Sequence, residues 1–401
     1  MSGILNKYDE ITNNKFVIAI MMFIFVIPMG ILGTLYAILP MFKIRLLLGL
    51  LVTIKFCIHL KNNKEFPPML IIGIIYCLGR IIRTYVATDI LKSSMFDYSS
   101  IVILPLMMLI ECTIESNTKN LIESLLIYIE TILFLNMFCI IIPQFAALFE
   151  DSSILGYDNY HFVYFCLALI IPYIYYYINK NKYTFINLII VWSITVLFSL
   201  KYWSATNLVA IFMFFISLFI SKKFKIANII SYIGFYYASF IGIIVFNIHH
   251  LFSFLIVDIL HKDITLSGRD PVWTKFKGEI VKSPILGIGY QQDSLWFPPH
   301  GKSKGKYLYA HNHILQELYN GGIVMYLIYI WFVILPAKKL WKNKDNSLTK
   351  VFSSIILAIL VHSLCESVSI AVFTLIYTLA YHVEDFIYSN NNKSSERPVN
   401  E

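Results

Sequence analysis

Long runs of apolar residues recur along almost the whole chain, and short polar stretches separate them. A helix needs roughly 17–25 mostly apolar residues to cross the hydrocarbon of a bilayer, so the pattern predicts about twelve membrane-spanning helices. The expected spans cover residues 16–39, 44–60, 69–86, 99–114, 121–148, 161–178, 185–200, 207–220, 227–246, 323–335, 352–368 and 370–388. We therefore expect an all-α polytopic membrane protein.

One polar stretch, residues 267–322, is much longer than the others and precedes the tenth expected span. With this stretch placed in a loop, we expect the chain to have four parts. Residues 1–248 hold the first nine spans, 249–320 form a large external loop, 321–388 hold the last three spans, and 389–401 form a polar tail. The tail lacks apolar residues to bury, so we expect it to be disordered. The loop is rich in Arg, His, Trp and Gly, so we expect it to be the catalytic part.

Two helices are expected inside the loop. Asp270 and Pro271 are favoured at a helix N-cap and first position, so they predict a helix from there to about Lys282. Its apolar residues would rest on the membrane surface or on the spans below; they are Val272, Trp273, Phe276, Ile280 and Val281. A second helix should begin near His311 and bend at Gly321-Gly322 into the tenth span.

Composition and charge agree with a membrane protein. Hydrophobic residues make up 58% of the chain and charged residues 14%, against about 25% charged residues in soluble domains. With both termini placed in the cytoplasm, most lysines fall in cytoplasmic turns, as the positive-inside rule requires. The net charge of +8 thus reflects topology. No basic run is interleaved with aromatic residues, so nucleic acid is not an expected partner.

The cysteines do not suggest a cofactor or a disulfide framework. All six, Cys57, Cys77, Cys112, Cys139, Cys166 and Cys365, fall in apolar spans, and the loop has none. Their spacing fits no metal site, and small apolar packing is the ordinary role of such residues. We expect neither a metal nor a cofactor.

Arg269 and His311 are the main candidates for chemistry. Arg269 precedes the expected loop helix, where its guanidinium and the helix amides together would suit a phosphate, although a pair with Asp263 or Asp270 is the alternative. An imidazole titrates near neutrality, so His311 can exchange a proton with a sugar hydroxyl or a leaving phosphate. Asn312 can orient His311 or the substrate, whereas His313 should face elsewhere.

Charged residues also fall within the spans. Arg80 and Arg83 share a helix face near the external end of the third span, where they could grip one anionic head group or snorkel to the interface. The buried acids Glu130 and Glu366 need a partner or a wet cavity. A proton-coupled transporter would use such acids, so they favour that rival interpretation.

The ordered set of loop motifs resembles the O-antigen ligase and polymerase superfamily. The motifs are Ser267-Gly268-Arg269, Trp273, Pro284, Gly287-Ile288-Gly289, Ala310-His311-Asn312, Leu315 and Gly321-Gly322. The resemblance implies a fold like that of the GT-C membrane glycosyltransferases, and a metal-independent reaction. In that reaction a glycan moves from undecaprenyl diphosphate to an acceptor on the outer side of the bacterial plasma membrane.

The resemblance also implies residue roles. Arg269 would contact the diphosphate, His311 would lie at the reaction centre, and Trp273 and Asn312 would belong to the substrate site. A Ser-Arg pair is expected at the start of an earlier span. Ser204 fits, but Ala205 stands in place of the arginine, so Arg80, Arg83 or Lys201 would supply the charge.

Three functions compete. The preferred one is a polymerase that joins undecaprenyl-diphosphate-linked repeat units into a capsule, O-antigen or exopolysaccharide. A ligase that transfers finished polymer would use the same parts, and a lipid-linked oligosaccharide flippase would not need the rich loop. The resemblance implies, as partners, the lipid-linked glycan, membrane lipid, and a chain-length regulator and flippase of the same pathway.

Overall fold

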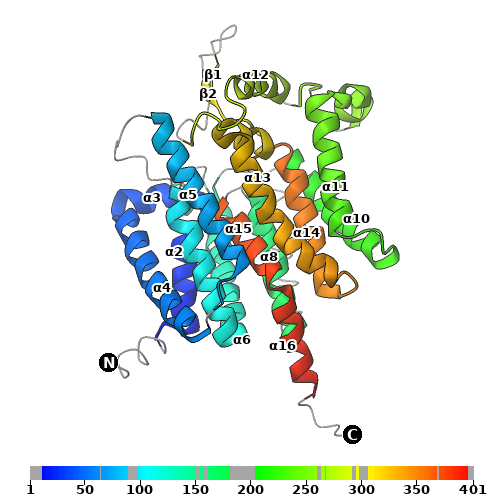
Figure 1. Ribbon diagram of the computed structural model, residues 1–401. Helices are drawn as coiled ribbons and strands as arrows, with labels where there is room; N and C mark the ends of the chain where they lie inside the picture. Colours follow the sequence, from blue (N-terminus) through cyan, green and yellow to red (C-terminus); the bar gives the residue numbers. More distant parts are fainter. Residues whose placement is uncertain are drawn as a thin grey trace.

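A computed structural model describes residues 11–63, 65–88, 98–149, 153–156, 161–180, 204–259, 263–266, 268–290, 295–297, 306–367 and 370–395 (Figure 1). It is a helical bundle with a small antiparallel hairpin, β1 (Leu295–Phe297) with β2 (Lys306–Leu308). The first half contains α2 (Lys15–Phe25), α3 (Met29–Ile38), α4 (Met41–Asn63), α5 (Pro68–Thr88), α6 (Tyr98–Ile141), α7 (Pro143–Ala146) and α8 (His161–Asn179). The second half contains α10 (Ala205–Lys223), α11 (Ile229–Phe240), η3 (Ile241–Val245), η4 (Ile248–Phe252), η5 (Phe254–Ile259), α12 (Arg269–Lys282), α13 (His313–Lys342), α14 (Ser347–Ser363), α15 (Ile370–Tyr381) and α16 (Val383–Ser395).

The helices confirm a multi-pass membrane protein. Among the described residues, five helices are long and apolar enough to cross a bilayer, or six if the bent pair α15 and α16 is one span. The α12 helix and the hairpin lie at one end of the bundle, here named the loop end, and the start of α2 and the end of α16 lie at the opposite end (Figure 1). The expected span 185–200 falls outside the described residues.

The longest helix, α6, folds back on itself at Asn117, whose φ and ψ are −164° and 86°. Lys55 on α4 donates to the Thr12 carbonyl and Arg45 donates to the Ile24 carbonyl, so α2 and α4 are antiparallel. The first half of α6 follows α4, through the Thr53–Met108 and His59–Glu115 contacts. Its second half follows α2, through Lys15–Glu123 and Val26–Tyr128. The two spans expected at 99–114 and 121–148 therefore form a helical hairpin.

The expected bend of α13 is confirmed at Gly322, where φ is 64° and ψ is −167°. The bend is sharp, because the rings of His313 and Tyr329, on opposite sides of it, lie with centroids 4.9 Å apart. A break in a helix frees backbone amides and carbonyls, which are costly to bury without hydrogen bonds.

Residues 284–289, here named the brace, supply those hydrogen bonds. The Ile288 and Gly289 amides donate to the carbonyls of Tyr319 and Asn320, at 2.9 and 2.7 Å. In return, the amides after the break, of Ile323 and Val324, donate to brace carbonyls. A Cβ at position 287 would lie 2.6 Å from the Asn320 backbone, so a glycine is required there. The glycine motifs thus have a structural role.

Three details of the sequence-based prediction are wrong. The expected first span 16–39 is interrupted between α2 and α3, because Pro28 cannot donate a backbone hydrogen bond. The loop helix begins at Arg269 after a left-handed Gly268, so Asp270 is not its N-cap. Its apolar face includes buried Val272, Trp273 and Phe276, which face α13, but Val281 is 76% exposed.

We predict that Gly322→Ala destabilises the protein strongly. A Cβ there would lie 2.3 Å from the Ile285 carbonyl oxygen, at a φ of +64° that disfavours side chains. Strain and displacement together should cost about 2–4 kcal/mol. Thermal unfolding in detergent should show a markedly lower midpoint. Gly278→Ala, on α12 with open space around it, is the control, and an equal loss in both variants would contradict the role of the brace.

Candidate functional site

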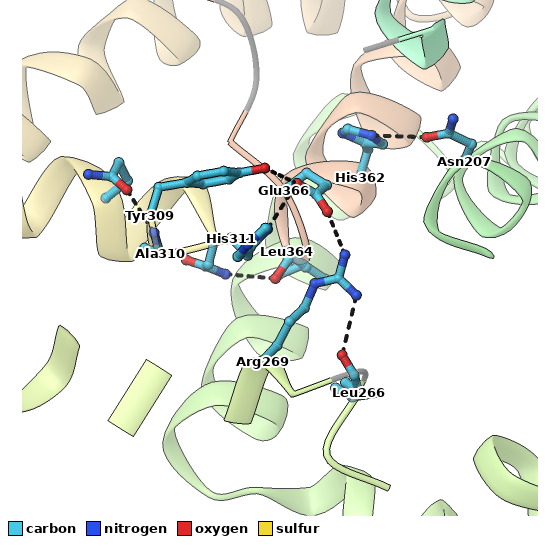
Figure 2. Close-up of polar contacts among 11 residues, drawn as sticks. Asn207, Leu266, Arg269, Tyr309, Ala310, His311, His362, Leu364 and Glu366 are labelled. Atoms are coloured by element: carbon cyan, nitrogen blue, oxygen red, sulfur yellow. Dashed lines mark hydrogen bonds and ion pairs between the residues drawn. The ribbon is translucent and has the colours of Figure 1, made fainter. Parts of the chain in front are cut away.

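Three segments bring polar side chains together at the loop end (Figure 2). Arg269 is the first residue of α12, and Tyr309, Ala310 and His311 precede α13. Glu366 lies in the turn that follows α14. These segments are far apart in the sequence, so their meeting depends on the fold.

Glu366 is the centre of this group. Its Oε1 accepts a hydrogen bond from Arg269 Nη2 at 2.5 Å, and its Oε2 lies 3.2 Å from His311 Nδ1. The Tyr309 hydroxyl also donates to Oε2, at 3.2 Å. The Glu366 side chain is only 3% exposed, whereas those of Arg269 and His311 are 18% and 22% exposed. A buried carboxylate thus holds two more accessible groups in place.

The backbone fixes the position of His311. Its φ is 47°, an uncommon value for a residue with a side chain. The next residue, Asn312, caps α13 by accepting the Leu315 amide at 2.9 Å, and donates to the Leu364 carbonyl at 2.9 Å. The Tyr309 ring lies beside the imidazole, with centroids 4.0 Å apart. Asn312 therefore joins the start of α13 to the turn that carries Glu366.

The charge of Glu366 is stabilised by its neighbours. Burial raises the pKa of this carboxyl, but the hydrogen bonds with His311 and Arg269 and the positive charge of the Arg269 guanidinium outweigh that effect, so its pKa lies below its ordinary value. A carboxylate facing Nδ1 favours a proton on that nitrogen and leaves Nε2 as an acceptor. The arrangement suits proton abstraction by His311, with a guanidinium beside it for an anion.

The amides at the start of α12 are already engaged. Those of Gly268, Arg269 and Asp270 all donate to Thr265, at 2.9, 3.0 and 3.2 Å. The prediction that they would bind an anion with Arg269 is therefore wrong. The expected alternative, a pair of Arg269 with Asp263 or Asp270, is wrong too, because the guanidinium pairs with Glu366.

Arg80 and Arg83 are engaged by the loop at two different places. Arg80 Nη1 lies 3.6 Å from Glu317 Oε1, and its guanidinium lies 3.8 Å from the centre of the Tyr290 ring. Arg83 donates to the Gly287 carbonyl of the brace. Burial and Glu317 raise the pKa of Tyr290, which donates to that carboxylate at 2.9 Å. In this structure both arginines anchor the loop to α5.

The remaining candidate residues lie in several places. Ser204 is the N-cap residue of α10, and Lys201 falls outside the described residues. Trp273 is 1% exposed and packs in the cluster under α12. His313 is buried between the rings of Tyr329 and Phe373. The start of α10 does approach the site, since Asn207 Oδ1 lies 3.2 Å from His362 Nε2, one turn before Glu366 (Figure 2).

Sequence reasoning missed Tyr309, His362 and the role of Glu366. The sequence indicates that Glu366 is a buried acid that needs a partner, but Arg269 and His311 are too distant along the chain for sequence spacing to identify them as its partners. Tyr309 directly precedes the Ala310-His311-Asn312 motif, and a tyrosine hydroxyl so close to His311 is a feature of the sequence that could have indicated a site residue.

The described residues hold no group of three or more His, Cys, Asp or Glu side chains that could bind a metal ion. Comparisons with models of protein families, with curated proteins and with solved structures find no match to this chain. The geometry of the site therefore carries the functional argument.

We predict that Glu366→Gln destabilises the protein by about 1.5–3 kcal/mol, because it weakens hydrogen bonds to charged groups. The folded-state pKa of Glu366 is depressed, so its contribution to stability is present above the unfolded pKa of about 4.3 and is lost as the pH falls through the folded value. Unfolding midpoints of the wild type and the variant should converge at acidic pH.

The control for this experiment is Glu279→Gln. Glu279 forms a pair with Lys282 that is more exposed, at 2.7 Å, and such pairs contribute about 0–1 kcal/mol. Equal effects of the two substitutions at neutral pH would show that the Glu366 contacts do not stabilise the fold.

Proposed function

We propose that this protein is a polysaccharide polymerase that joins polyprenyl-diphosphate-linked oligosaccharides at the outer face of the plasma membrane. The observation that carries the proposal is the arrangement of His311, Glu366 and Arg269 at the loop end of a membrane bundle. It combines a group that can accept a proton with a cation for a diphosphate, beside the bilayer where a lipid-linked donor lies.

In the proposed reaction, a hydroxyl of the acceptor sugar attacks the anomeric carbon of the donor glycan. A new glycosidic bond forms, the bond from that carbon to the diphosphate oxygen breaks, and His311 Nε2 takes the hydroxyl proton. Glu366, on the other ring nitrogen, stabilises the imidazolium. Arg269 stabilises the negative charge that grows on the departing diphosphate.

Glu366 no longer favours the rival hypothesis of a transporter. Glu366 favoured it as a buried acid that needs a partner or a wet cavity. The guanidinium of Arg269 and the imidazole of His311 now supply that partner. A ligase would use the same groups, so the distinction between ligase and polymerase rests on the acceptor.

The proposal includes a topology of about twelve spans with the loop end outside. Tyr177, near the end of α8, contacts Asn346 at the end opposite to the loop, whereas α10 begins beside His362 at the loop end. The described residues on the two sides of the expected span 185–200 therefore lie at opposite ends of the bundle, which supports this part of the proposal. A fold like the GT-C glycosyltransferases is part of the same proposal.

We predict that His311→Ala and Arg269→Ala each lower the rate of polymer formation by about 10²–10⁴-fold, the usual effect of losing a general base or a charge-stabilising group. The measurement uses purified protein in liposomes with a polyprenyl-diphosphate oligosaccharide, and sizes the products by gel. His59→Ala is the control, because it breaks a His–Glu pair at the opposite end of the bundle.

In the native host, deletion of the gene should leave single repeat units on the lipid carrier at the outer face, unrescued by either variant. Repeat units trapped at the inner face would contradict the proposal and favour a flippase. Long polymer left on the carrier lipid would indicate a ligase instead.

A further inference from the structure

The connection between α11 and α12 contains irregular helical turns with large exposed apolar side chains. The chain turns at Asn247, whose φ of 52° lies in the left-handed region that asparagine tolerates. The turns η4 and η5 follow. A helix needs roughly 20 residues to cross a bilayer, so residues 248–259 are too few to span it. They lie at the loop end, near α12 (Figure 1).

The apolar side chains of this connection point away from the protein. Leu251 is 81% exposed, Phe246 and Phe254 are each 68% exposed, and Ile259 is 55% exposed. Exposure of so much apolar surface to water is unfavourable. Contact with the acyl chains of lipid would be favourable for the same side chains. Exposed apolar residues of α10, α11 and η3 continue this surface; they are Phe212, Phe215, Phe219, Ile230, Phe235, Ile241 and Val245.

Two contacts join this connection to the helix that carries Arg269. His250 Nε2 lies 3.4 Å from Oδ2 of Asp270, the residue after Arg269. Lys277 on α12 donates to the Ile244 carbonyl at 2.9 Å. Ile244 is itself buried in the apolar cluster that contains Trp273. The position of residues 246–259 in the bilayer therefore bears on the position of α12.

We propose that residues 246–259 form an interfacial segment that inserts its apolar side chains into the outer leaflet of the bilayer and holds Arg269 at the level of the lipid head groups. The occupant of this surface is the lipid itself. The segment presents apolar side chains outward, so insertion depends on apolar burial rather than on anionic lipid. The consequence for Arg269 rests on the function proposed above, whereas the lipid contact does not.

Photo-cross-linking tests the lipid contact without any need for activity. A benzophenone side chain replaces Leu251 or Phe254 in full-length protein, reconstituted in vesicles of phosphatidylethanolamine and phosphatidylglycerol, and mass spectrometry measures lipid adducts. Phe212, exposed on α10, is the lipid-facing reference, and Thr274, exposed on α12, is the polar reference.

We expect adduct yields at positions 251 and 254 to match Phe212, to exceed Thr274 several-fold, and to persist in phosphatidylethanolamine with phosphatidylcholine. Yields as low as that of Thr274, or cross-links to a second copy of the chain in place of lipid, would overturn the proposal.

A second experiment tests the link to Arg269. Phe254→Asp should raise KM for a polyprenyl-diphosphate donor about tenfold, which corresponds to about 1.4 kcal/mol, with a smaller effect on kcat. The control is Ile226→Asp, since Ile226 is 78% exposed in the turn between α10 and α11, at the opposite end of the bundle. Equal KM values for the two variants would refute the link. An inactive wild-type protein with strong lipid adducts would refute the proposed function and leave the interfacial segment intact.

Discussion

The break of α13 at Gly322, and the brace that bonds to it, hold the loop to the bundle. A bundle surrounded by lipid cannot leave freed backbone groups unsatisfied. The brace and the broken helix satisfy each other, through carbonyls before the break and amides after it. The brace follows α12, whose first residue is Arg269, and α13 begins just after His311. The same hydrogen bonds therefore join the two segments that carry the candidate catalytic side chains.

A buried carboxylate completes the site from a third direction. Glu366 stands beyond the end of α14 and faces Arg269 and His311 on its two oxygens. A buried ion pair adds little stability over well-packed apolar residues, but it is costly to break. Its contribution here is geometric, because it fixes a guanidinium at the start of α12 relative to an imidazole that precedes α13. Asn312 reinforces the arrangement by bonding to the Leu364 carbonyl of the same turn.

The sequence predicts the helical membrane class, the loop helix to within a residue or two, and the bend at Gly322, since apolar runs and glycines act locally. It also brings forward Arg269 and His311, which share one site in the structure. It does not reveal their common partner, because Glu366 is distant in the sequence and spacing carries no information about such contacts. The sequence also does not reveal the contacts of Arg80 with Glu317 and of Arg83 with Gly287, for a related reason. A helix face shows which residues are neighbours, but not what docks on them.

Among the described residues of the loop end, two groups combine an arginine, a glutamate and a tyrosine. Arg80, Glu317 and Tyr290 join α5 to the loop, and the Arg80 and Glu317 side chains are 12% and 5% exposed. Arg269, Glu366 and Tyr309 have similar burial and similar contacts. What distinguishes the second group is His311, which shares the Glu366 carboxylate and adds an imidazole, a side chain that can accept and donate protons. A guanidinium and a carboxylate together can hold a structure in place without exchanging protons at neutral pH. The group that contains the His311 imidazole can therefore perform proton transfer, whereas the group of Arg80, Glu317 and Tyr290 anchors the loop.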